Sequence, residues 1–188
     1  EADKHAFVER RPSKKPFFHP TGMMPKLARC MVNLARARPG EFVLDPFCGT
    51  GSILVEAALI GCRVLGADIS ARMAFGCLLN MRFFGLEPEG ILVADAFRPP
   101  ARQADRVVTD PPYGRSASTA GLGVKQVFER FLALLPELLP KGHVACVSGP
   151  SRLSLSEMGA EAGLEPVETH FFFVHGDLTR ELAVLKVP

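Results

Sequence analysis

The stretch EFVLDPFCGTGSIL, residues 41–54, places two closely spaced glycines between two apolar runs. The run EFVLD is typical of a short buried strand, and the residues from Gly49 to Ile60 are typical of a helix. Gly49 and Gly51 allow a tight turn and a close approach of the backbone to a ligand at the helix N-terminus. A strand, a glycine turn and a helix in this order predict the first unit of a doubly wound α/β sheet.

The rest of the chain alternates in the same way. Further strands are expected over 63–68, 91–95, 105–110 and 143–149, and further helices over 23–37, 70–84, 124–139 and 151–162. Near the C-terminus, two strand-like runs within 166–187 are joined by a polar turn at Gly176-Asp177, which is a hairpin signal. The pattern predicts a mostly parallel, doubly wound sheet with a C-terminal antiparallel hairpin.

Composition is that of an ordinary globular domain. The 188 residues are 47% hydrophobic and 22% charged, enough for one domain with a sizeable core. No apolar run reaches the roughly 18 residues that span a membrane, and no signal-peptide pattern is present. The five cysteines are scattered and form no C-x-x-C pair, which argues against a disulfide framework and a zinc site. We expect a reducing compartment and a cytoplasmic location.

Three acids follow the first three expected strands. Asp45 precedes the glycines, Asp68 ends the second strand and Asp95 ends the third. The dinucleotide fingerprint G-x-G-x-x-G fails because Leu54 occupies its third glycine position. An acid before the glycines repels a pyrophosphate and suits a ligand with an ammonium group. Taken singly, each acid could be a helix cap or a turn residue, but the three in order favour a ligand site.

S-adenosylmethionine is a ligand of the required kind, because it carries an α-amine and a sulfonium and has no phosphate. We expect Asp45 to meet its amino end and Asp68 its ribose hydroxyls. Asp95 and the adjacent Ala96 are expected at the adenine amine. All of these residues lie at the carboxyl ends of expected strands, where open α/β sheets bind their ligands.

The stretch TDPPYG, residues 109–114, follows the apolar pair Val107-Val108 and contains the only tyrosine of the chain. Two consecutive prolines fix the backbone and remove two N–H donors, and the residue before a proline is extended. Asp110 is therefore expected on a rigid turn, where its carboxylate and the neighbouring carbonyls must find donors elsewhere. Such a turn is either a stiff corner or a preset array of acceptors for a ligand.

In combination these motifs resemble the amino-methyltransferases, which methylate exocyclic amines of nucleobases. The resemblance rests on VLDPFCGTGSILVEAA, VLGADIS and TDPPYG, in this order. With PFFHPTGMMPKLAR before the glycines and DPPYGRSAS after them, the chain is closer still to the archaeal tRNA guanine-N2 methyltransferases that act on guanosine ten. The resemblance covers nearly the whole chain. It implies a Rossmann-like, S-adenosylmethionine-dependent methyltransferase that modifies the N2 amine of a guanosine in tRNA.

This resemblance suggests a role for each residue of the rigid turn. Asp110 and the carbonyl of Pro111 would accept the two N–H bonds of the guanine amine, and Pro112 would keep the turn rigid. The ring of Tyr113 would stack on a base flipped out of its helix. The same resemblance puts His19, Pro20 and Thr21 beside the methionine end of the cofactor.

Taken together, the expected cofactor residues are His19, Pro20, Thr21, Asp45, Phe47, Gly49, Gly51, Asp68, Ile69, Asp95, Ala96 and Asp110. No metal is expected. The segment 114–123 is either a mobile lid over the flipped base or an ordinary solvent loop. Phe171, Phe172 and Phe173 are expected in the core of the sheet, and a base-stacking role for one of them is the lesser alternative.

Other functions stay open at this point. The acceptor array suits any planar amine, so a DNA adenine-N6 or an rRNA guanine-N2 methyltransferase is an alternative. A non-catalytic module that binds the cofactor or docks RNA is an alternative of another class, but it would not need the complete array. A dinucleotide oxidoreductase is disfavoured by Asp45 and by the incomplete glycine fingerprint.

Charge divides the chain into two parts. Residues 1–40 carry a balance of +6 and residues 41–188 a balance of −4. We expect residues 1–22 to form an extended basic arm or linker, with Arg10, Arg11, Lys14 and Lys15 near tRNA phosphates, and residues 23–188 to form the catalytic domain. The resembled family carries an upstream THUMP domain that holds tRNA. Since the sequence begins with Glu and contains no such domain, we expect a catalytic fragment.

Overall fold

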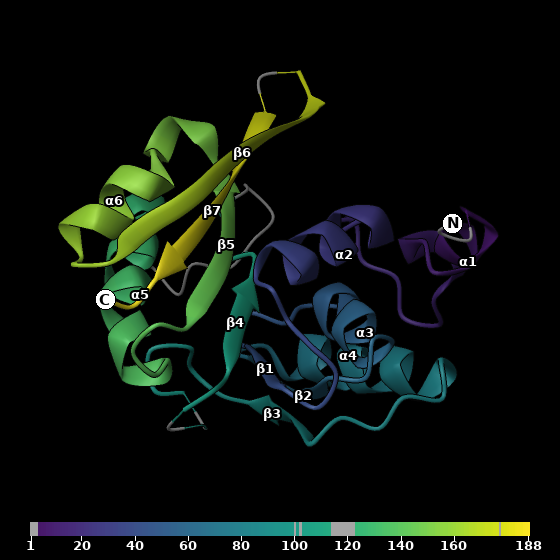
Figure 1. Cartoon of the computed structure of the whole chain (residues 1–188). Coiled ribbons are helices and arrows are strands. Elements are labelled where there is room, and N and C mark those ends of the chain that lie inside the picture. The colour runs from purple at the N-terminus through teal and green to yellow at the C-terminus, as the bar shows by residue number, and fades with distance from the viewer. Residues whose placement is uncertain (1–3, 100, 102, 114–122, 177) are drawn as a thin grey trace.

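A seven-stranded sheet with the strand order β3-β2-β1-β4-β5-β7-β6 forms the centre of the protein (Figure 1). The structure, a computed structural model, describes residues 4–99, 101, 103–113, 123–176 and 178–188. Its strands are β1 (Phe42–Asp45), β2 (Arg63–Asp68), β3 (Gly90–Val93), β4 (Arg106–Thr109), β5 (Val144–Pro150), β6 (Glu165–His175) and β7 (Leu178–Lys186). β1 to β5 are parallel, whereas β7 is antiparallel to both β5 and β6. The expected α/β sheet with a terminal antiparallel hairpin is confirmed.

Helices cover both faces of the sheet (Figure 1). They are α1 (Lys4–Glu9), α2 (Pro25–Leu34), α3 (Ser52–Ala58), α4 (Ala71–Phe83), α5 (Val124–Leu138) and α6 (Leu155–Glu161), with short 3-10 turns at Pro12–Lys14 and Ser151–Leu153. α2, α3 and α4 pack on one face and α5 and α6 on the other.

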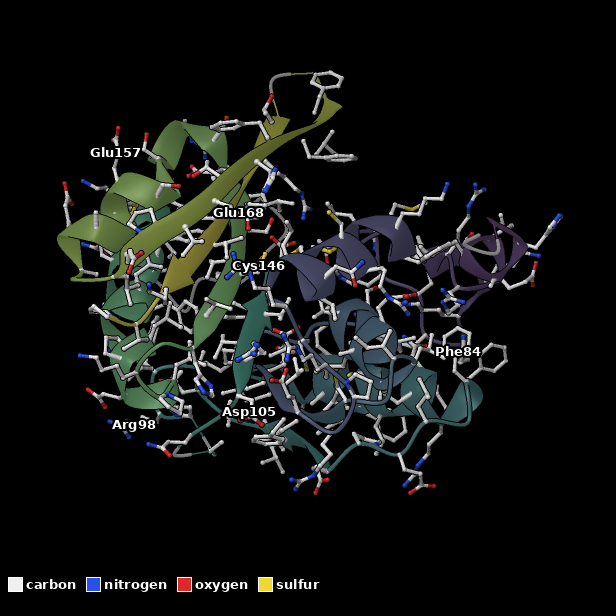
Figure 2. The ribbon with its side chains drawn as sticks, in the orientation of Figure 1. Phe84, Arg98, Asp105, Cys146, Glu157 and Glu168 are labelled. Atoms are coloured by element: carbon white, nitrogen blue, oxygen red, sulfur yellow. The ribbon has the colours of Figure 1, made fainter. Side chains whose placement is uncertain are left out.

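Alternation along the strands builds a separate core on each face. Val43 and Val108 pack against the α2–α4 layer, while their neighbours Leu44 and Val107 pack against the α5–α6 layer. Cys146 of β5 is fully buried in the first of these cores (Figure 2). Near-continuous apolar strands of this kind are typical of parallel sheets, which are covered on both faces.

The N-terminal segment differs from the expected extended arm. It contains α1 and a 3-10 turn, and it packs against α3 and α4. The Lys15 ammonium is buried and donates to Ser52 Oγ at 2.8 Å. The ring of Phe17 lies directly on Gly76, where an added Cβ would stand 2.1 Å from it. The extended-arm expectation is wrong here because basic and aromatic side chains of the segment have partners in α3 and α4.

The three consecutive phenylalanines were also expected in the wrong place. Phe171, Phe172 and Phe173 are 66%, 46% and 67% exposed. They belong to β6, the edge strand of the sheet, near the end of the hairpin that projects from the body of the protein (Figure 1). Apolar character alone predicted burial, but an edge strand buries less of its surface than a central one. Asp177 of the expected turn lies outside the described residues.

Candidate active site

A cavity of about 740 Å³ opens at the carboxyl ends of β1, β2 and β4. β1 lies between β2 and β4 in the sheet, so this is the point at which the strand order reverses, where α/β sheets bind ligands. The cavity brings together every site residue expected from the sequence except Gly51. They are His19, Pro20, Thr21, Asp45, Phe47, Gly49, Asp68, Ile69, Asp95, Ala96, Asp110, Pro111, Pro112 and Tyr113.

Gly51 does not line the cavity and has a structural role instead. It adopts a left-handed φ of 80° at the N-cap of α3, and an added Cβ would lie 2.5 Å from Cys77 Sγ in α4. A side chain at this position would therefore separate the glycine turn from α4. Gly49, with a φ of 51°, does line the cavity. Gly49 therefore shapes the wall of the cavity, whereas Gly51 allows the turn to pack against α4.

Four acids among the described residues line the cavity, and three of them are held by their own turns. Asp45, Asp68 and Asp95 each accept a hydrogen bond from the backbone N–H two residues further along, at 3.2, 2.8 and 3.0 Å. Asp110 cannot do so, because the residue two positions further along is Pro112, which has no N–H. Its carboxylate is therefore the one that depends on more distant donors.

Asp45 lies at the floor of the cavity and is only 1% exposed. Thr109 Oγ1 donates to its Oδ1 at 2.6 Å. Burial raises the pKa of Asp45 to about 7, against the opposing effect of this hydrogen bond. Among the described residues no partner is found for Oδ2, so this carboxylate can receive a cationic ligand. The arrangement fits the ammonium group predicted for this position.

Asp68 connects the second strand to the glycine turn. Its Oδ2 accepts from the backbone N–H of Gly49 at 3.0 Å, and burial raises its pKa. Asp95 is exposed and lies two residues beyond the end of β3, which stops at Val93 rather than at 95 as expected. Both acids line the cavity and retain acceptor capacity for ligand hydroxyl or amino groups.

Asp110 is held by a residue of the terminal hairpin. Arg180 Nη1 donates to Asp110 Oδ2 at 2.7 Å, and both side chains are mostly buried. Burial raises the pKa of Asp110, whereas the charge of Arg180 and the nearby hydroxyls of Ser148 and Tyr113 lower it. Among the described residues, these two hydroxyls and Asp110 Oδ1 are buried and find no hydrogen-bond partner of regular geometry. Most of the acceptor capacity of the carboxylate is therefore unused by the described residues.

Tyr113 presents an aromatic ring to the same cavity. Burial raises the pKa of its hydroxyl well above the usual value, with the neighbouring Asp110 charge as the next cause. The guanidinium of Arg180 stands 5.4 Å from the centre of the ring. Tyr113 is thus a neutral ring at the edge of the cavity, suited to stacking rather than to proton transfer.

Sequence reasoning missed two contributors to this region, Arg180 and Asn80, and favoured the sheet core for a third, Phe172. Arg180 and Phe172 line the cavity, and both come from the terminal hairpin. Asn80 of α4 is fully buried and donates to the carbonyls of Phe17 and Thr50, which ties the N-terminal segment to the glycine turn. Only the alternation of side chains along the hairpin could have suggested Phe172, and nothing local marks Asn80 or Arg180.

One expectation from the sequence about the site lies outside the described residues. It concerns the segment 114–122, expected as a lid or a solvent loop. In the described part of the chain, no cluster of three or more His, Cys, Asp or Glu side chains is arranged to hold a metal ion. Within the same residues, no helix is both long and apolar enough to cross a membrane.

Comparison with known proteins agrees with this geometry. Residues 12–181 match the UPF0020 family, described as an RMKL-like methyltransferase domain. A tRNA (guanine(10)-N2)-dimethyltransferase of Methanothermobacter thermautotrophicus is 42% identical over 97% of this chain, which covers 54% of that protein. A probable tRNA (guanine(10)-N2)-dimethyltransferase of Methanothermococcus thermolithotrophicus is 34% identical over 86% of this chain and 98% of its own length.

Among solved structures, TrmN from Thermus thermophilus superimposes with a TM-score of 0.77 and 28% identity, covering 89% of this chain and 50% of TrmN. The chain spans about half the length of three archaeal relatives and nearly the whole of a fourth. The matched segment contains the glycine turn, the acids and the double-proline turn. The chain therefore belongs to the UPF0020 family of RMKL-like methyltransferase domains, together with the archaeal tRNA (guanine(10)-N2)-dimethyltransferases.

Proposed function

We propose that the chain is the catalytic part of an enzyme that transfers a methyl group from S-adenosylmethionine to the N2 amine of a guanosine in tRNA. The observation that carries the proposal is the state of Asp110. Its carboxylate stands on a rigid double-proline turn in the cavity, and Arg180 is the one described residue that hydrogen-bonds to it with regular geometry. A buried acceptor with unused capacity is costly unless a ligand supplies donors, and a nucleobase amine supplies two.

The residues around the glycine turn fit the cofactor. Asp45 would receive the α-amine and Asp68 the ribose, while Asp95 and Ala96 would border the adenine. His19 and Thr21, joined by a 2.8 Å contact between Nδ1 and Oγ1, would border the methionine end. When bound, S-adenosylmethionine supplies a methyl group activated by a positively charged sulfur.

The double-proline turn prepares the substrate amine. The lone pair of a guanine amine is delocalised into the ring, which makes the amine a poor nucleophile. Hydrogen bonds from the amine to Asp110 and to the Pro111 carbonyl would hold its lone pair in one direction, and positioning of this kind supplies much of a rate enhancement. After transfer the nitrogen must lose a proton, and we assign Asp110 as the acceptor because burial raises the pKa of its carboxylate.

Cofactor choice is tested by calorimetric titration of the protein with S-adenosylmethionine and, separately, with NAD. We expect binding of S-adenosylmethionine and none of NAD at the same concentrations. Asp45 accounts for this expectation, because its carboxylate attracts the ammonium group and repels a pyrophosphate. Tighter binding of NAD would overturn the cofactor assignment.

The reaction is tested by incubating the full-length protein with methyl-labelled S-adenosylmethionine and three substrates in parallel: tRNA, rRNA and double-stranded DNA. Digestion to nucleosides identifies the product, and N2-methylated guanosine from tRNA is expected. The digest also separates one methyl group from two. Methylated adenine from DNA would assign another substrate, and label in none of the three would favour a non-catalytic binding module.

An upstream RNA-binding domain, of the THUMP type by resemblance, completes the proposal. With tRNA as the substrate, the enzyme would work in the cytoplasm. The four expected charges near the N-terminus, Arg10, Arg11, Lys14 and Lys15, do not form one free group, since Arg10 pairs with Glu56 and Lys15 with Ser52. Target choice would therefore depend on the upstream domain. If residues 1–188 alone methylate one tRNA guanosine as fast as the full-length protein, this part of the proposal is wrong.

A further inference from the structure

The two strands of the terminal hairpin fix Arg180 next to the double-proline turn. Its backbone is held in the antiparallel ladder, where Arg180 pairs with Pro150 of β5 and with Phe172 of β6. From this position the side chain reaches Asp110 at 2.7 Å, 70 residues away in the sequence. The side chains of Arg180 and Asp110 are only 14% and 18% exposed. The pair is therefore a partly buried contact between sheet and turn, unlike a solvated surface ion pair.

Arg180 replaces a hydrogen bond that the turn cannot make. The other three acids of the cavity each use the N–H two residues further along, and Pro112 deprives Asp110 of that donor. Without such a donor the Asp110 carboxylate would rotate, and its oxygens would no longer point toward the substrate amine. The guanidinium supplies the missing donor from a rigid strand, and its planar shape limits the orientations open to the carboxylate.

The Arg180 guanidinium also contacts Tyr113, the residue of the turn that is assigned to stack on the substrate base. It lies 5.4 Å from the centre of the Tyr113 ring. One side chain thus touches the acceptor and the stacking ring at once. Among the described residues, the charges and titratable groups that face Asp110 are Arg180 from β7, Tyr113 from its own turn and Asp45 from β1, with the Ser148 hydroxyl from β5. Among them, only Arg180 is a cation.

We propose that Arg180 is a positioning residue for methyl transfer, which holds the Asp110 carboxylate ionised and correctly oriented in place of the backbone N–H that Pro112 lacks. The inference rests on the proposed function, because it assumes that Asp110 receives the substrate amine. It assigns a role to the terminal hairpin that goes beyond completing the sheet. A purely structural ion pair would instead affect stability and leave the reaction unchanged.

Arg106 offers a matched control. It is 13% exposed and pairs with Glu41 at 2.9 Å, much as Arg180 pairs with Asp110. It is the first residue of β4 and directly follows Asp105, which Figure 2 labels. Asp110 follows the last residue of the same strand. Removing its charge should cost stability without touching the cavity, because Arg106 is not among the residues that line it.

The experiment compares Arg180→Met, Arg180→Lys and Arg106→Met in the full-length protein. The single-turnover rate is measured against pH with saturating S-adenosylmethionine and tRNA, and cofactor affinity is measured by calorimetry. We expect Arg180→Met to slow transfer about 100-fold, the scale of a misplaced reacting group. It should also move the acidic limb of the rate profile to higher pH, because loss of the cation raises the pKa of Asp110.

Arg180→Lys should return the acidic limb toward its original pH with partial recovery of the rate, since it restores the charge but not the planar donor. Arg106→Met should leave the rate within about twofold, as expected for a site away from the chemistry. Cofactor affinity should stay unchanged in all three variants. An unchanged affinity attributes the shift of the acidic limb to Asp110, because a change at Asp45 would alter cofactor binding. An unmoved pH limb in Arg180→Met, or an equal loss of rate in Arg106→Met, would overturn the inference alone. Absence of tRNA methylation by the wild-type protein would instead overturn the proposed function and this inference with it.

Discussion

The Thr109 hydroxyl donates a 2.6 Å hydrogen bond to Oδ1 of Asp45, and so joins the ends of β1 and β4 beneath the cavity. These strands are parallel neighbours, and both residues are almost fully buried. The bond orients the carboxylate and leaves Oδ2 for a ligand. Burial nonetheless dominates and raises the pKa of Asp45 to about 7. The buried Asp45 carboxylate therefore lowers the stability of the protein without ligand, and a bound cation would offset that loss.

Asp45→Asn should accordingly separate stability from binding. The folded-state pKa of about 7 lies above the unfolded value near 3.8, so the wild-type protein loses stability as the pH rises from about 4 to about 7. Asparagine removes that loss, and we expect a higher melting temperature for the variant at pH 8 and no difference near pH 4. Affinity for S-adenosylmethionine should fall about 10- to 100-fold at pH 7.5, because a charge-assisted bond is lost.

Thermal unfolding and calorimetry at several pH values provide the measurements. The wild-type affinity for S-adenosylmethionine should rise with pH through about 7, as Asp45 ionises, whereas the variant should show no such rise. A variant that is destabilised at pH 8, or that binds the cofactor as well as the wild-type protein does, would contradict the assigned role.

Asp110→Ala should abolish methyl transfer while leaving cofactor affinity within a small factor. The reason is that Asp110 is assigned to the substrate amine and is held by Arg180 rather than by the glycine turn. Asp68→Ala is the comparison, because Asp68 accepts from Gly49 of that turn at 3.0 Å and should weaken cofactor binding. Rate assays and calorimetry on both variants decide the matter. The assignment is wrong if Asp110→Ala loses cofactor binding as severely as Asp68→Ala.

Tyr113→Phe should be mild and Tyr113→Ala severe. Stacking uses the ring, and the hydroxyl of Tyr113 has no hydrogen bond of regular geometry to any described residue, so its removal costs little. Loss of the ring should cost about 1–3 kcal/mol of stacking in kcat/KM for tRNA. Steady-state kinetics with tRNA measures both variants. A large loss of activity in Tyr113→Phe would indicate that the hydroxyl takes part in the chemistry.

Phe172 and Phe173 provide a matched pair on one strand. Successive residues of a strand face opposite sides, and Phe172 lines the cavity whereas Phe173 does not, although both rings are substantially exposed. We expect Phe172→Ala to lower kcat/KM for tRNA about 5- to 100-fold through lost contact with the base. Phe173→Ala should stay within about twofold. Equal effects of the two substitutions would remove Phe172 from the substrate site.

The fold and most of the candidate site could be predicted because their signals are local. Period-two and helical apolar patterns identify the strands and helices, and the parallel order then gathers the strand ends at one edge. Asp45, Asp68 and Asp110 follow from that topology, since each stands at or just after the end of a parallel strand. The glycine turn adds a backbone requirement that few other residues meet.

Contacts between distant segments could not be predicted in this way. Arg180 meets Asp110 across 70 residues, and Asn80 meets Phe17 across 63, with no periodic pattern to connect either pair. Charge misled the interpretation of the N-terminal segment. The basic stretch predicts an extended arm near tRNA phosphates, whereas Arg10 pairs with Glu56, whose side chain is only 1% exposed. In each case tertiary partners, rather than composition, decide where a side chain lies.

Lys14 and Lys15 are adjacent in the sequence, but we expect Lys14 to contribute to tRNA binding and Lys15 to stability. Lys14 is exposed, whereas Lys15 is 6% exposed, donates to Ser52 Oγ at 2.8 Å and has its pKa lowered to about 8 by burial. In the full-length protein, Lys14→Ala should weaken tRNA binding and reduce the slope of log affinity against log salt by about one, with an unchanged melting temperature. Lys15→Ala should lower the melting temperature by several degrees, because it leaves a cavity and an unpaired Ser52. Filter binding at several salt concentrations and thermal unfolding measure both. If the two variants lose tRNA affinity equally while both keep their stability, the segment is a free basic arm in solution and its packing against α3 does not hold.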